Sequence, residues 1–323
     1  MPASFETTKK SLGPNGIIIL DKPEGLSSAQ AVGRVKRLLG ARKAGHAGTL
    51  DPFATGVLVC MLNQATRLGR FLLAGEKTYT AVLRLGIATD TQDGTGQVIE
   101  RQPVAARIEK RLTGVFRRFE GEIVQTPPAY SALKHKGVPL YKLARQGRPV
   151  HKPARRVRIS ALRIEAVKLP EIYFRVTCSA GTYIRSLCAD IGQDLGCGGH
   201  LSQLRRTNSS GFGIDTAIDL ADLEKRVRTR RADVPLISPA AALPGMETLI
   251  ADADTTRKIN NGVRLTLDDL APPAPQDLNK PASDETRFYK IIDLRKRLWA
   301  IVTFRPLAKT YDYCCVFPDT VAG

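Results

Sequence analysis

The residues with the clearest potential for chemistry lie between Gly45 and Leu58, in the stretch GHAGTLDPFATGVL. Its glycines allow another molecule to approach the backbone closely, and Asp51 is its only acidic residue. No Gly-Lys-Ser/Thr follows, so the stretch is not a phosphate-binding P-loop. Asp51 is either a turn former before Pro52 or a nucleophilic carboxylate, and spacing alone favours the turn.

The charge of the chain points to a polyanionic partner. The 323 residues include 49 Lys and Arg against 31 Asp and Glu, a formal net charge of +18. Residues 241–323 carry 11 basic and 11 acidic residues, so the excess lies in residues 1–240. Residues 131–168 alone hold 11 Lys or Arg with one acid, Glu165. Such a lopsided stretch favours a phosphate-contacting surface over an ordinary solvated face, and nucleic acid over an acidic membrane.

Several classes of protein are disfavoured by what the sequence lacks. The six cysteines form no CxxC pair and the four histidines lack zinc-site spacing, so we expect free thiols, no metal and a reducing cytoplasm. The start, MPASFETTKK, has no apolar core of a signal peptide. No apolar run approaches the ~18–20 residues of a membrane span. We therefore expect a cytoplasmic protein.

The elements that would position Asp51 follow from periodicity and turn signals. Short alternating or β-branched runs predict strands at 16–20, 56–61, 77–85, 157–167, 172–179, 200–206 and 211–214. Amphipathic patterns predict helices at 65–74, 104–119, 182–195 and 220–228, and a further helix capped by Ser27 or Ser28 that ends near Leu39. Residues 40–49 are typical of a loop. The elements lack regular βαβ alternation, which predicts an α+β fold with a largely antiparallel sheet.

The carboxy-terminal part is predicted to be a separate small β domain. Residues 235–244 are typical of a linker, and short strands are expected at 262–265, 289–293 and 298–304. Residues 270–284 are rich in Pro, Asp and Asn and predict a loop or a disordered insert. We therefore expect one domain over residues 1–240, with a basic insertion at about 125–156 that has weak helical periodicity at 140–146, and a second domain over residues 245–323.

The stretch around Asp51 resembles the signature of the TruB family of pseudouridine synthases. The resemblance continues, in the right order, in GIIILDKPEGLSS, EKTY, QTPPAYSALK, GTYIRSL and LRR, and spans about residues 16–225. It implies a pseudouridine-synthase fold: a mixed, largely antiparallel sheet flanked by helices, with a basic insertion and a carboxy-terminal PUA-like β domain. It also implies an isomerase that converts uridine to pseudouridine in the T loop of tRNA, at position U55.

The resemblance assigns the chemistry to particular residues. Asp51 corresponds to the essential nucleophile, which attacks C1′ or C6 or assists a glycal intermediate; the sequence leaves these routes open. Arg185 corresponds to the guanidinium that keeps this carboxylate charged and oriented, although its position one residue after Ile184 also suits a helix-surface cation. Tyr79 corresponds to the tyrosine that stacks on the target base and helps move the C5 proton, where periodicity alone indicates an ordinary strand aromatic.

Three further residues are assigned to the substrate pocket by the same resemblance. Tyr183 corresponds to a second pocket aromatic. Leu204 corresponds to an apolar pocket residue, although a core leucine is an equally good interpretation. His46 corresponds to a histidine that helps fill the space left by the flipped nucleotide.

The resemblance also describes the partners. The reaction gains and loses no atom, so no cofactor or metal is expected. The target uridine is stacked in the RNA and must be flipped out, at a cost of a few kcal/mol. The T-arm stem-loop of tRNA would be gripped by the basic insertion, without a guide RNA, since QTPPAYSALK belongs to stand-alone bacterial enzymes rather than dyskerin-type relatives. A monomer is expected. The alternative is a non-catalytic RNA-binding protein, which would leave the GTLDP, KTY and YIR motifs unexplained.

Overall fold

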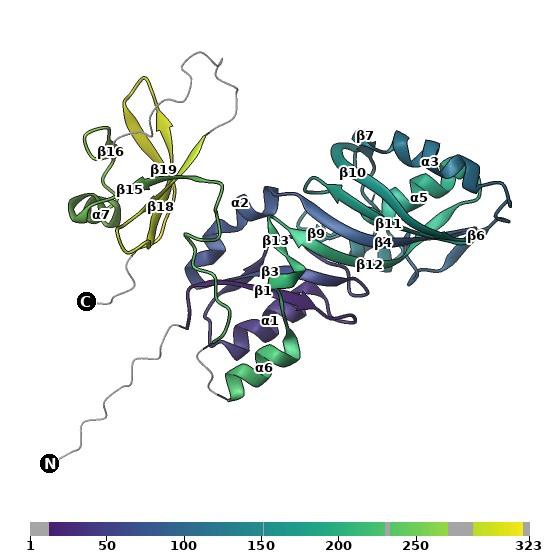
Figure 1. Ribbon diagram of the computed structural model, residues 1–323, viewed down its shortest axis with the longest axis horizontal. Coiled ribbons are helices and arrows are strands. Elements are labelled where there is room, and N and C mark those ends of the chain that lie inside the picture. The colour runs from purple at the N-terminus through teal and green to yellow at the C-terminus, as the bar shows by residue number, and fades with distance from the viewer. Residues whose placement is uncertain (1–12, 151, 230–232, 271–286, 319–323) are drawn as a thin grey trace.

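The computed structural model describes residues 13–150, 152–229, 233–270 and 287–318, which form two main sheets with flanking helices (Figure 1). The large sheet has the order β14 (Ile218–Asp219), β1 (Gly16–Lys22), β3 (Thr55–Leu62), β12 (Gly199–Ser209), β4 (Lys77–Leu85), β11 (Glu171–Cys178), β10 (Arg155–Lys168) and β7 (Gly121–Gln125). Two short strands lie off this path: β2 (Ala44–His46) pairs with β3, and β13 (Phe212–Gly213) with β12. Only the β1–β14 and β3–β12 pairs of this sheet are parallel. The predicted α+β fold with a largely antiparallel sheet is confirmed.

The half of the sheet around β1 and β3 is buried on both faces. Ile18 and Leu20 of β1 pack against α1 (Ser28–Leu38) and α6 (Leu220–Arg228). Ile17 and Ile19 face the opposite side, toward η1 (Asn63–Leu68) and α2 (Gly69–Ala74). Successive side chains of a strand point to opposite faces, so a doubly covered strand needs a continuous apolar run. This is why the sequence identifies β1 and β3 so clearly.

The other half of the sheet carries α3 (Glu109–Arg118) and α5 (Ile184–Leu195) on one face. The apolar stripe of α5 packs against β4 and β12, as its periodicity predicts. The helix ends at Gly196, whose φ of 81° is the left-handed conformation that glycine adopts without strain. This packing fixes the direction of the first turn of α5, where Arg185 lies. The remaining small elements are β5 (Ile87–Thr89), β6 (Val98–Arg101), β8 (Lys134–His135), β9 (Val138–Pro139), α4 (Leu140–Arg145) and η2 (Ile214–Thr216).

The two halves of the large sheet meet along a narrow seam. Strand β12 pairs with β3 through only two residue pairs, Arg205 with Thr55 and Arg206 with Gly56. Gly56 has φ +100°, and a Cβ atom there would lie 2.2 Å from the carbonyl oxygen of Arg206. Only glycine fits this close approach. The Asp51 loop immediately precedes this seam.

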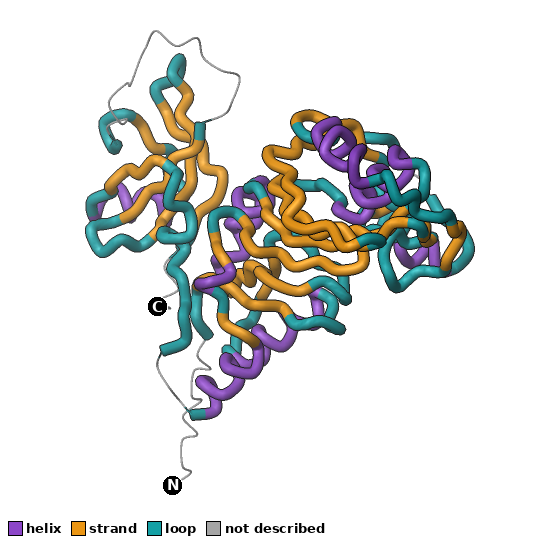
Figure 2. The backbone as a smooth tube through the Cα atoms, turned by 45° about the vertical axis from the view of Figure 1, so that its right-hand side comes forward, coloured by secondary structure: helices purple, strands orange, loops and turns teal. Residues whose placement is uncertain are grey.

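The second sheet has the order β15 (Glu247–Ile250), β17 (Phe288–Ile292), β18 (Leu298–Arg305), β19 (Thr310–Val316) and β16 (Leu265–Thr266). Helix α7 (Ala253–Asn260) lies beside it. Figure 2 shows it as a strand layer apart from the large sheet. Leu298, Ile301 and Phe317 nevertheless share a buried cluster with Ile17 and Ile19, so the two sheets are joined by apolar packing.

Some local predictions need correction. Residues 40–49 are not all loop, because Ala44–His46 forms β2 against β3. The helix predicted at 65–74 is a 3-10 helix followed by a short α-helix, and the helix predicted at 104–119 begins only at Glu109. In the second sheet, the strands β15 and β19 had not been predicted, nor had the helix α7 beside it. The insert predicted at 270–284 lies outside the described residues except for Leu270.

Two properties bear on the class of protein. All six cysteines are free. Among the described residues, no helix is long and apolar enough to cross a membrane.

Candidate active site

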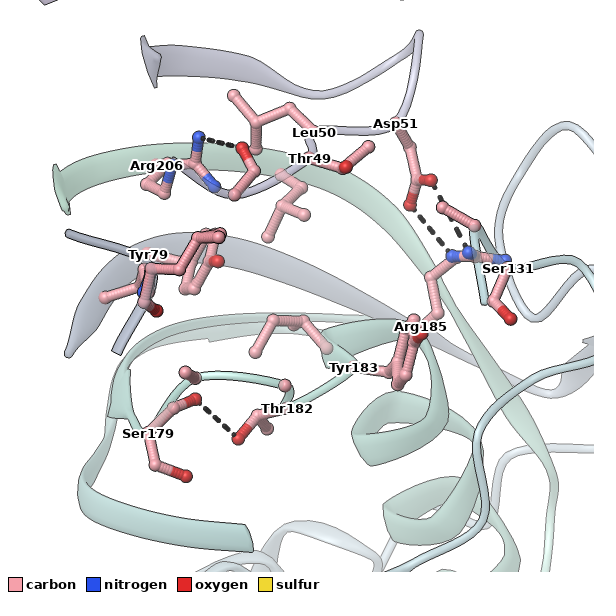
Figure 3. A pocket seen from close by; sticks show the side chains of 18 of the residues that line it. Thr49, Leu50, Asp51, Tyr79, Ser131, Ser179, Thr182, Tyr183, Arg185 and Arg206 are labelled. Atoms are coloured by element: carbon pink, nitrogen blue, oxygen red, sulfur yellow. Dashed lines mark hydrogen bonds and ion pairs between the residues drawn. The ribbon is translucent and has the colours of Figure 1, made fainter. Parts of the chain in front are cut away.

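The predicted site residues surround a cavity of about 410 Å³ beside the seam of the large sheet (Figure 3). The Asp51 loop, β4, β12 and the start of α5 contribute to its wall, and residues 131–133 of the insertion cover part of it. Five of the six predicted side chains line this cavity: Asp51, Tyr79, Tyr183, Arg185 and Leu204. Residues more than 150 positions apart in the sequence are thereby brought to one place.

The loop that carries Asp51 is held by hydrogen bonds to buried groups. The Ser28 hydroxyl donates to the carbonyl of Leu50 at 3.0 Å and accepts from its N–H at 2.8 Å. The Lys22 ammonium is fully buried and donates to the carbonyls of Leu26 at 2.7 Å and Pro52 at 3.3 Å. The Asp51 side chain therefore starts from a backbone fixed on both sides.

Arg185 binds the Asp51 carboxylate with two nitrogens. Its Nε lies 2.9 Å from Oδ2 and its Nη2 lies 3.4 Å from Oδ1. The Arg185 side chain is 5% exposed and that of Asp51 is 34% exposed, so the pair is buried on the guanidinium side and open on the carboxylate side. Figure 3 shows the two groups facing each other at one end of the cavity. A planar guanidinium held in this way fixes the orientation of the carboxylate.

Arg185 is held in turn by partners beyond the cavity wall. It donates to the carbonyls of Thr91 at 2.9 Å and Tyr130 at 2.8 Å. The buried Asp93 carboxylate lies 3.7 Å from its Nε, and it accepts from Thr91 and from the backbone and hydroxyl of Thr95. One cation is thus shared between two carboxylates, and only that of Asp51 opens into the cavity.

Burial raises the pKa of the Asp51 carboxyl above its ordinary value, while the charge of Arg185 opposes this rise and that of Asp93 adds to it. Desolvation is the largest of these influences on the pKa of Asp51, and the charge of Arg185 acts against it. A carboxylate that is costly to keep charged is a stronger base and nucleophile than a solvated one.

The opposite end of the cavity holds an aromatic ring and a buried guanidinium. The Tyr79 side chain is 8% exposed, and the Arg206 guanidinium lies 6.0 Å from the centre of its ring. Burial raises the pKa of the Tyr79 phenol, so its hydroxyl stays protonated at neutral pH. Arg206 is 1% exposed and donates to the carbonyls of Val57 at 2.7 Å and Gly48 at 3.1 Å.

Tyr183 and Leu204 complete the wall between these two ends. Tyr183 precedes α5, and its backbone exchanges two hydrogen bonds with the Gln125 amide, at 2.8 and 3.0 Å. The Arg155 guanidinium lies 5.2 Å from the Tyr183 ring. Leu204 is 9% exposed and belongs both to the apolar core and to the cavity wall. The two interpretations of this leucine are therefore compatible.

His46 is the one predicted site residue that does not line the cavity. It lies in β2, opposite Cys60, and is half-buried. Burial and the nearby Arg206 lower the pKa of its imidazole, and its Nδ1 has no hydrogen-bond partner among the described residues.

Sequence reasoning assigned no role to three charged groups near the cavity. Arg206 and Lys77 lie within motifs that had been recognised, but only their neighbours were singled out. Asp93 lies in a turn rich in Thr, Asp and Gly that carried no signal of function. Burial lowers the pKa of Lys77 to about 8. The cavity is therefore positively charged around one open carboxylate, which suits an anionic substrate.

The arrangement defines a class of chemistry. An oriented carboxylate faces a cavity whose aromatic walls can stack a planar ring, and buried cations surround it. No group of His, Cys, Asp and Glu suited to a metal ion occurs among the described residues. Such a site can form a covalent bond to, or take a proton from, a planar heterocycle held in the cavity. The mixed sheet and the motifs whose residues line this cavity resemble those of a pseudouridine synthase, an isomerase.

Comparisons with known proteins give the family. The TruB family pseudouridylate synthase N-terminal domain matches residues 36–184, and the tRNA pseudouridylate synthase B C-terminal domain matches residues 185–250. The chain is 48% identical to tRNA pseudouridine synthase B of Geotalea uraniireducens, over 79% of this chain and 83% of that one. It is 44% identical to tRNA pseudouridine synthase B of Ralstonia pickettii, over 86% of each. The chain therefore belongs to the TruB family of pseudouridine synthases.

The chain shares its fold with one chain of a larger assembly. The archaeal box H/ACA sRNP Nop10–Cbf5 complex contains a chain that matches with a TM-score of 0.71 at 25% identity, covering 98% of this chain and 90% of that one. The similarity extends over both sheets, so the second sheet is part of the shared architecture.

Proposed function

We propose that this protein isomerises uridine to pseudouridine at position U55 in the T loop of tRNA, without a guide RNA. The observation that carries the proposal is the Asp51 carboxylate, bound on one side by Arg185 and open on the other to a cavity with aromatic walls. The names of the bacterial relatives give tRNA as their substrate. Identity to bacterial relatives is 44–48%, against 25–28% for chains of H/ACA or Cbf5 complexes, which favours a stand-alone enzyme.

The reaction is a rearrangement within one nucleotide. The bond from ribose C1′ to uracil N1 breaks, the base turns, and a bond forms from C1′ to C5. The proton at C5 leaves and N1 gains one, so atoms and charge balance without cofactor or metal. Asp51 attacks C1′ or C6, or assists departure of the base through a glycal. On each route the residue must be ionised and close to the glycosidic bond.

The other side chains orient the reactants. Arg185 holds Asp51 charged and in line with the substrate, and Tyr79 stacks on the flipped uracil and helps move the C5 proton. Tyr183 and Leu204 shape the pocket around the base. His46, outside the cavity, fills the position that the flipped nucleotide leaves in the RNA.

The remaining expectations concern the RNA and the domains. We propose a catalytic domain over residues 1–240, in which the basic insertion at 125–156 grips the T arm, and a PUA-like domain over residues 245–323. The protein works as a monomer in the cytoplasm, where its tRNA substrate and its free thiols are both maintained.

A direct assay tests the proposal. Purified protein is incubated with an unmodified T-arm stem-loop and no other RNA, and pseudouridine is mapped by carbodiimide-blocked primer extension. Product at U55 supports the proposal, and a stem-loop with cytidine at that position is the control. Binding without product would favour a non-catalytic RNA-binding protein, and product only after a guide RNA is added would favour the guided class.

A further inference from the structure

Helix α2 contacts the second sheet on one side and the catalytic cavity on the other. The Phe71 ring packs edge-on against the Phe288 ring of β17, with the ring centres 5.1 Å apart and the ring planes at 80°. Leu73, two residues further on, lines the cavity. Residues two apart in an α-helix point in nearly opposite directions, about 200° apart around the axis. Figure 1 shows α2 between the two sheets, so this short helix is a direct path from one to the other.

Apolar packing holds α2 to the second sheet. Leu72 is 2% exposed and belongs to the buried cluster that both sheets share, and Phe288 and Met246 pack against this cluster. The guanidinium of Arg70 lies 4.9 Å from the centre of the Phe71 ring and 5.0 Å from that of Phe288. A cation that lies over two touching rings strengthens the contact between them. Phe288 therefore fixes the direction of α2 from the second sheet.

The other side of α2 is tied to the cavity wall by Lys77. The ammonium of Lys77 donates to the carbonyl of Leu73 at 2.5 Å and to that of Gly75, and so caps the last turn of the helix. Lys77 is 6% exposed, lines the cavity and lies two residues before Tyr79 on β4. Leu73 is 44% exposed, so its side chain is accessible to a ligand in the cavity. The direction of α2 therefore sets the position of Leu73 and of its contact with Lys77.

The carboxy-terminal end of α2 fits closely against the turn between β12 and β13. The Ser210 hydroxyl donates to the carbonyl of Leu72, and the Ser210 N–H donates to the carbonyl of Glu76 at 2.9 Å. A Cβ atom on Gly75 would lie 2.7 Å from the Oγ of Ser210, so the two segments have no room to come closer. This contact makes the end of α2 a fixed point. Loss of the packing on Phe288 would let the helix turn about that point and change the direction of the Leu73 side chain.

We propose that Phe288 is a positioning residue for the reaction, which acts through α2 on the place of Leu73 and Lys77 in the cavity wall. This proposal rests on the proposed function and assigns the second sheet a part in the chemical step. A misplacement of about 1 Å at a reacting centre can cost on the order of 10²-fold in rate. Leu73 and Lys77 belong to the wall and not to the reacting pair, so the effect of a change at Phe288 is smaller.

The test compares two aromatic residues of the second sheet. Phe288→Ala removes the ring that contacts α2. Phe304→Ala is the matched control, because Phe304 is also partly buried, and the centre of its ring lies 5.0 Å from that of Tyr311 in the second sheet's own core. Phe288→Leu retains an apolar side chain at the contact and should recover most of the lost rate.

Single-turnover rates are measured at saturating concentrations of unmodified tRNA transcript, and RNA affinity is measured separately. We expect Phe288→Ala to lower the rate about three- to tenfold and Phe304→Ala to leave it within about twofold of the wild type. Thermal unfolding checks that each variant is folded. Arg70→Gln removes the cation from both rings without opening a cavity, so it should lower the rate about twofold, and it decides the test if Phe288→Ala does not fold.

A double-mutant cycle tests whether Phe288 acts through α2. Leu73→Ala shortens the side chain at the cavity, and Phe288→Ala loosens the helix that carries it. Because both changes act at the same place in the wall, the loss in the double variant should be clearly smaller than the product of the two single losses. The same cycle with Phe304→Ala should be multiplicative.

The outcomes separate this inference from the proposed function. A wild-type rate at saturating RNA in Phe288→Ala, even with weaker binding, would overturn the inference, and so would an equal loss in Phe304→Ala. Independent losses in the cycle of Phe288 and Leu73 would also overturn it, because the effect would then not pass through α2. Failure of the proposed function would appear instead as wild-type protein that binds tRNA and makes no pseudouridine.

Discussion

Two aspartate–arginine pairs lie close to the seam of the large sheet, and they differ in the burial of the arginine. Arg205 binds Asp21 with two nitrogens, at 3.1 and 2.6 Å, much as Arg185 binds Asp51. The Arg205 side chain is 42% exposed, however, against 5% for Arg185. Arg205 lines a separate hollow with Glu24 and Glu165.

The comparison shows that contact geometry alone does not define a reactive site. An exposed pair is worth about 0–1 kcal/mol and is screened by salt. Desolvating two charges costs several kcal/mol, so a buried pair is retained for what its groups do rather than for stability. In the Asp51–Arg185 pair this cost falls mainly on the guanidinium, which is 5% exposed, and burial also raises the pKa of the Asp51 carboxyl.

The largest expected effect is that of Asp51→Asn. The amide keeps the shape of the side chain but cannot act as a nucleophile, so turnover should fall by roughly 10⁴-fold or more. Binding of the T-arm stem-loop should persist, because the cations around the cavity remain. Single-turnover release of tritium from C5-labelled RNA measures the rate. A much smaller loss of turnover in this variant would refute the nucleophile assignment.

The next effect is that of Arg185→Lys, which keeps the charge and removes the two-nitrogen contact. Misplacing the carboxylate by about 1 Å should cost on the order of 10²-fold in turnover, with little change in RNA affinity. Arg205→Lys is the matched change at the exposed pair and should leave turnover nearly intact. Equal losses in the two variants would remove the distinction between the pairs.

The pH dependence of turnover and of stability provides a further test of the Asp51–Arg185 pair. Asp51 must be ionised to react, so turnover should fall as pH drops through a pKa above the ordinary 3.8. The pKa of Asp51 is raised in the folded protein, so the folded protein binds this proton more tightly than the unfolded chain does. The contribution of Asp51 to the free energy of unfolding therefore declines as pH rises through the same window, while turnover increases. Single-turnover rates and thermal unfolding across pH 4–8 measure both trends. A rate that stays level down to pH 4 in folded protein would contradict the assignment.

The smallest expected effect is that of Asp21→Asn. It removes an exposed ion pair, so stability should change by about 0–1 kcal/mol, less at high salt, and turnover by no more than about twofold. Urea unfolding at low and high salt measures the first quantity. A loss of turnover comparable to that of Arg185→Lys would show that the Asp21 pair belongs to the reactive machinery.

Sequence patterns predicted the helices and strands in which buried apolar residues recur at a regular spacing. Strand β4 was predicted with the observed bounds, and the strands β10 and β11 were predicted from their alternation to within a few residues. The elements that were missed depend on partners distant in sequence. Strand β2 has only three residues and exists because it pairs with β3, and β19 is only half-buried, so its apolar pattern is weak.

Five of the residues that line the cavity could be named from the sequence, but the architecture of the cavity could not. The motifs identified Asp51, Tyr79 and Arg185 because they resemble a family, and no local rule would have selected them. The Arg185 guanidinium contacts both Asp51 and Asp93, and these contacts require a fold that brings three separate segments of the chain together. Such convergence leaves no periodicity in the sequence.

The narrow seam between β3 and β12 leaves only two residue pairs to join the strands of the two halves of the large sheet. The Asp51 loop adds a second connection between these halves. Leu50 and Ala54, on either side of Asp51, belong to the apolar core that α5 covers, and the same loop leads directly into β3. The position of the carboxylate therefore depends on the packing of both halves.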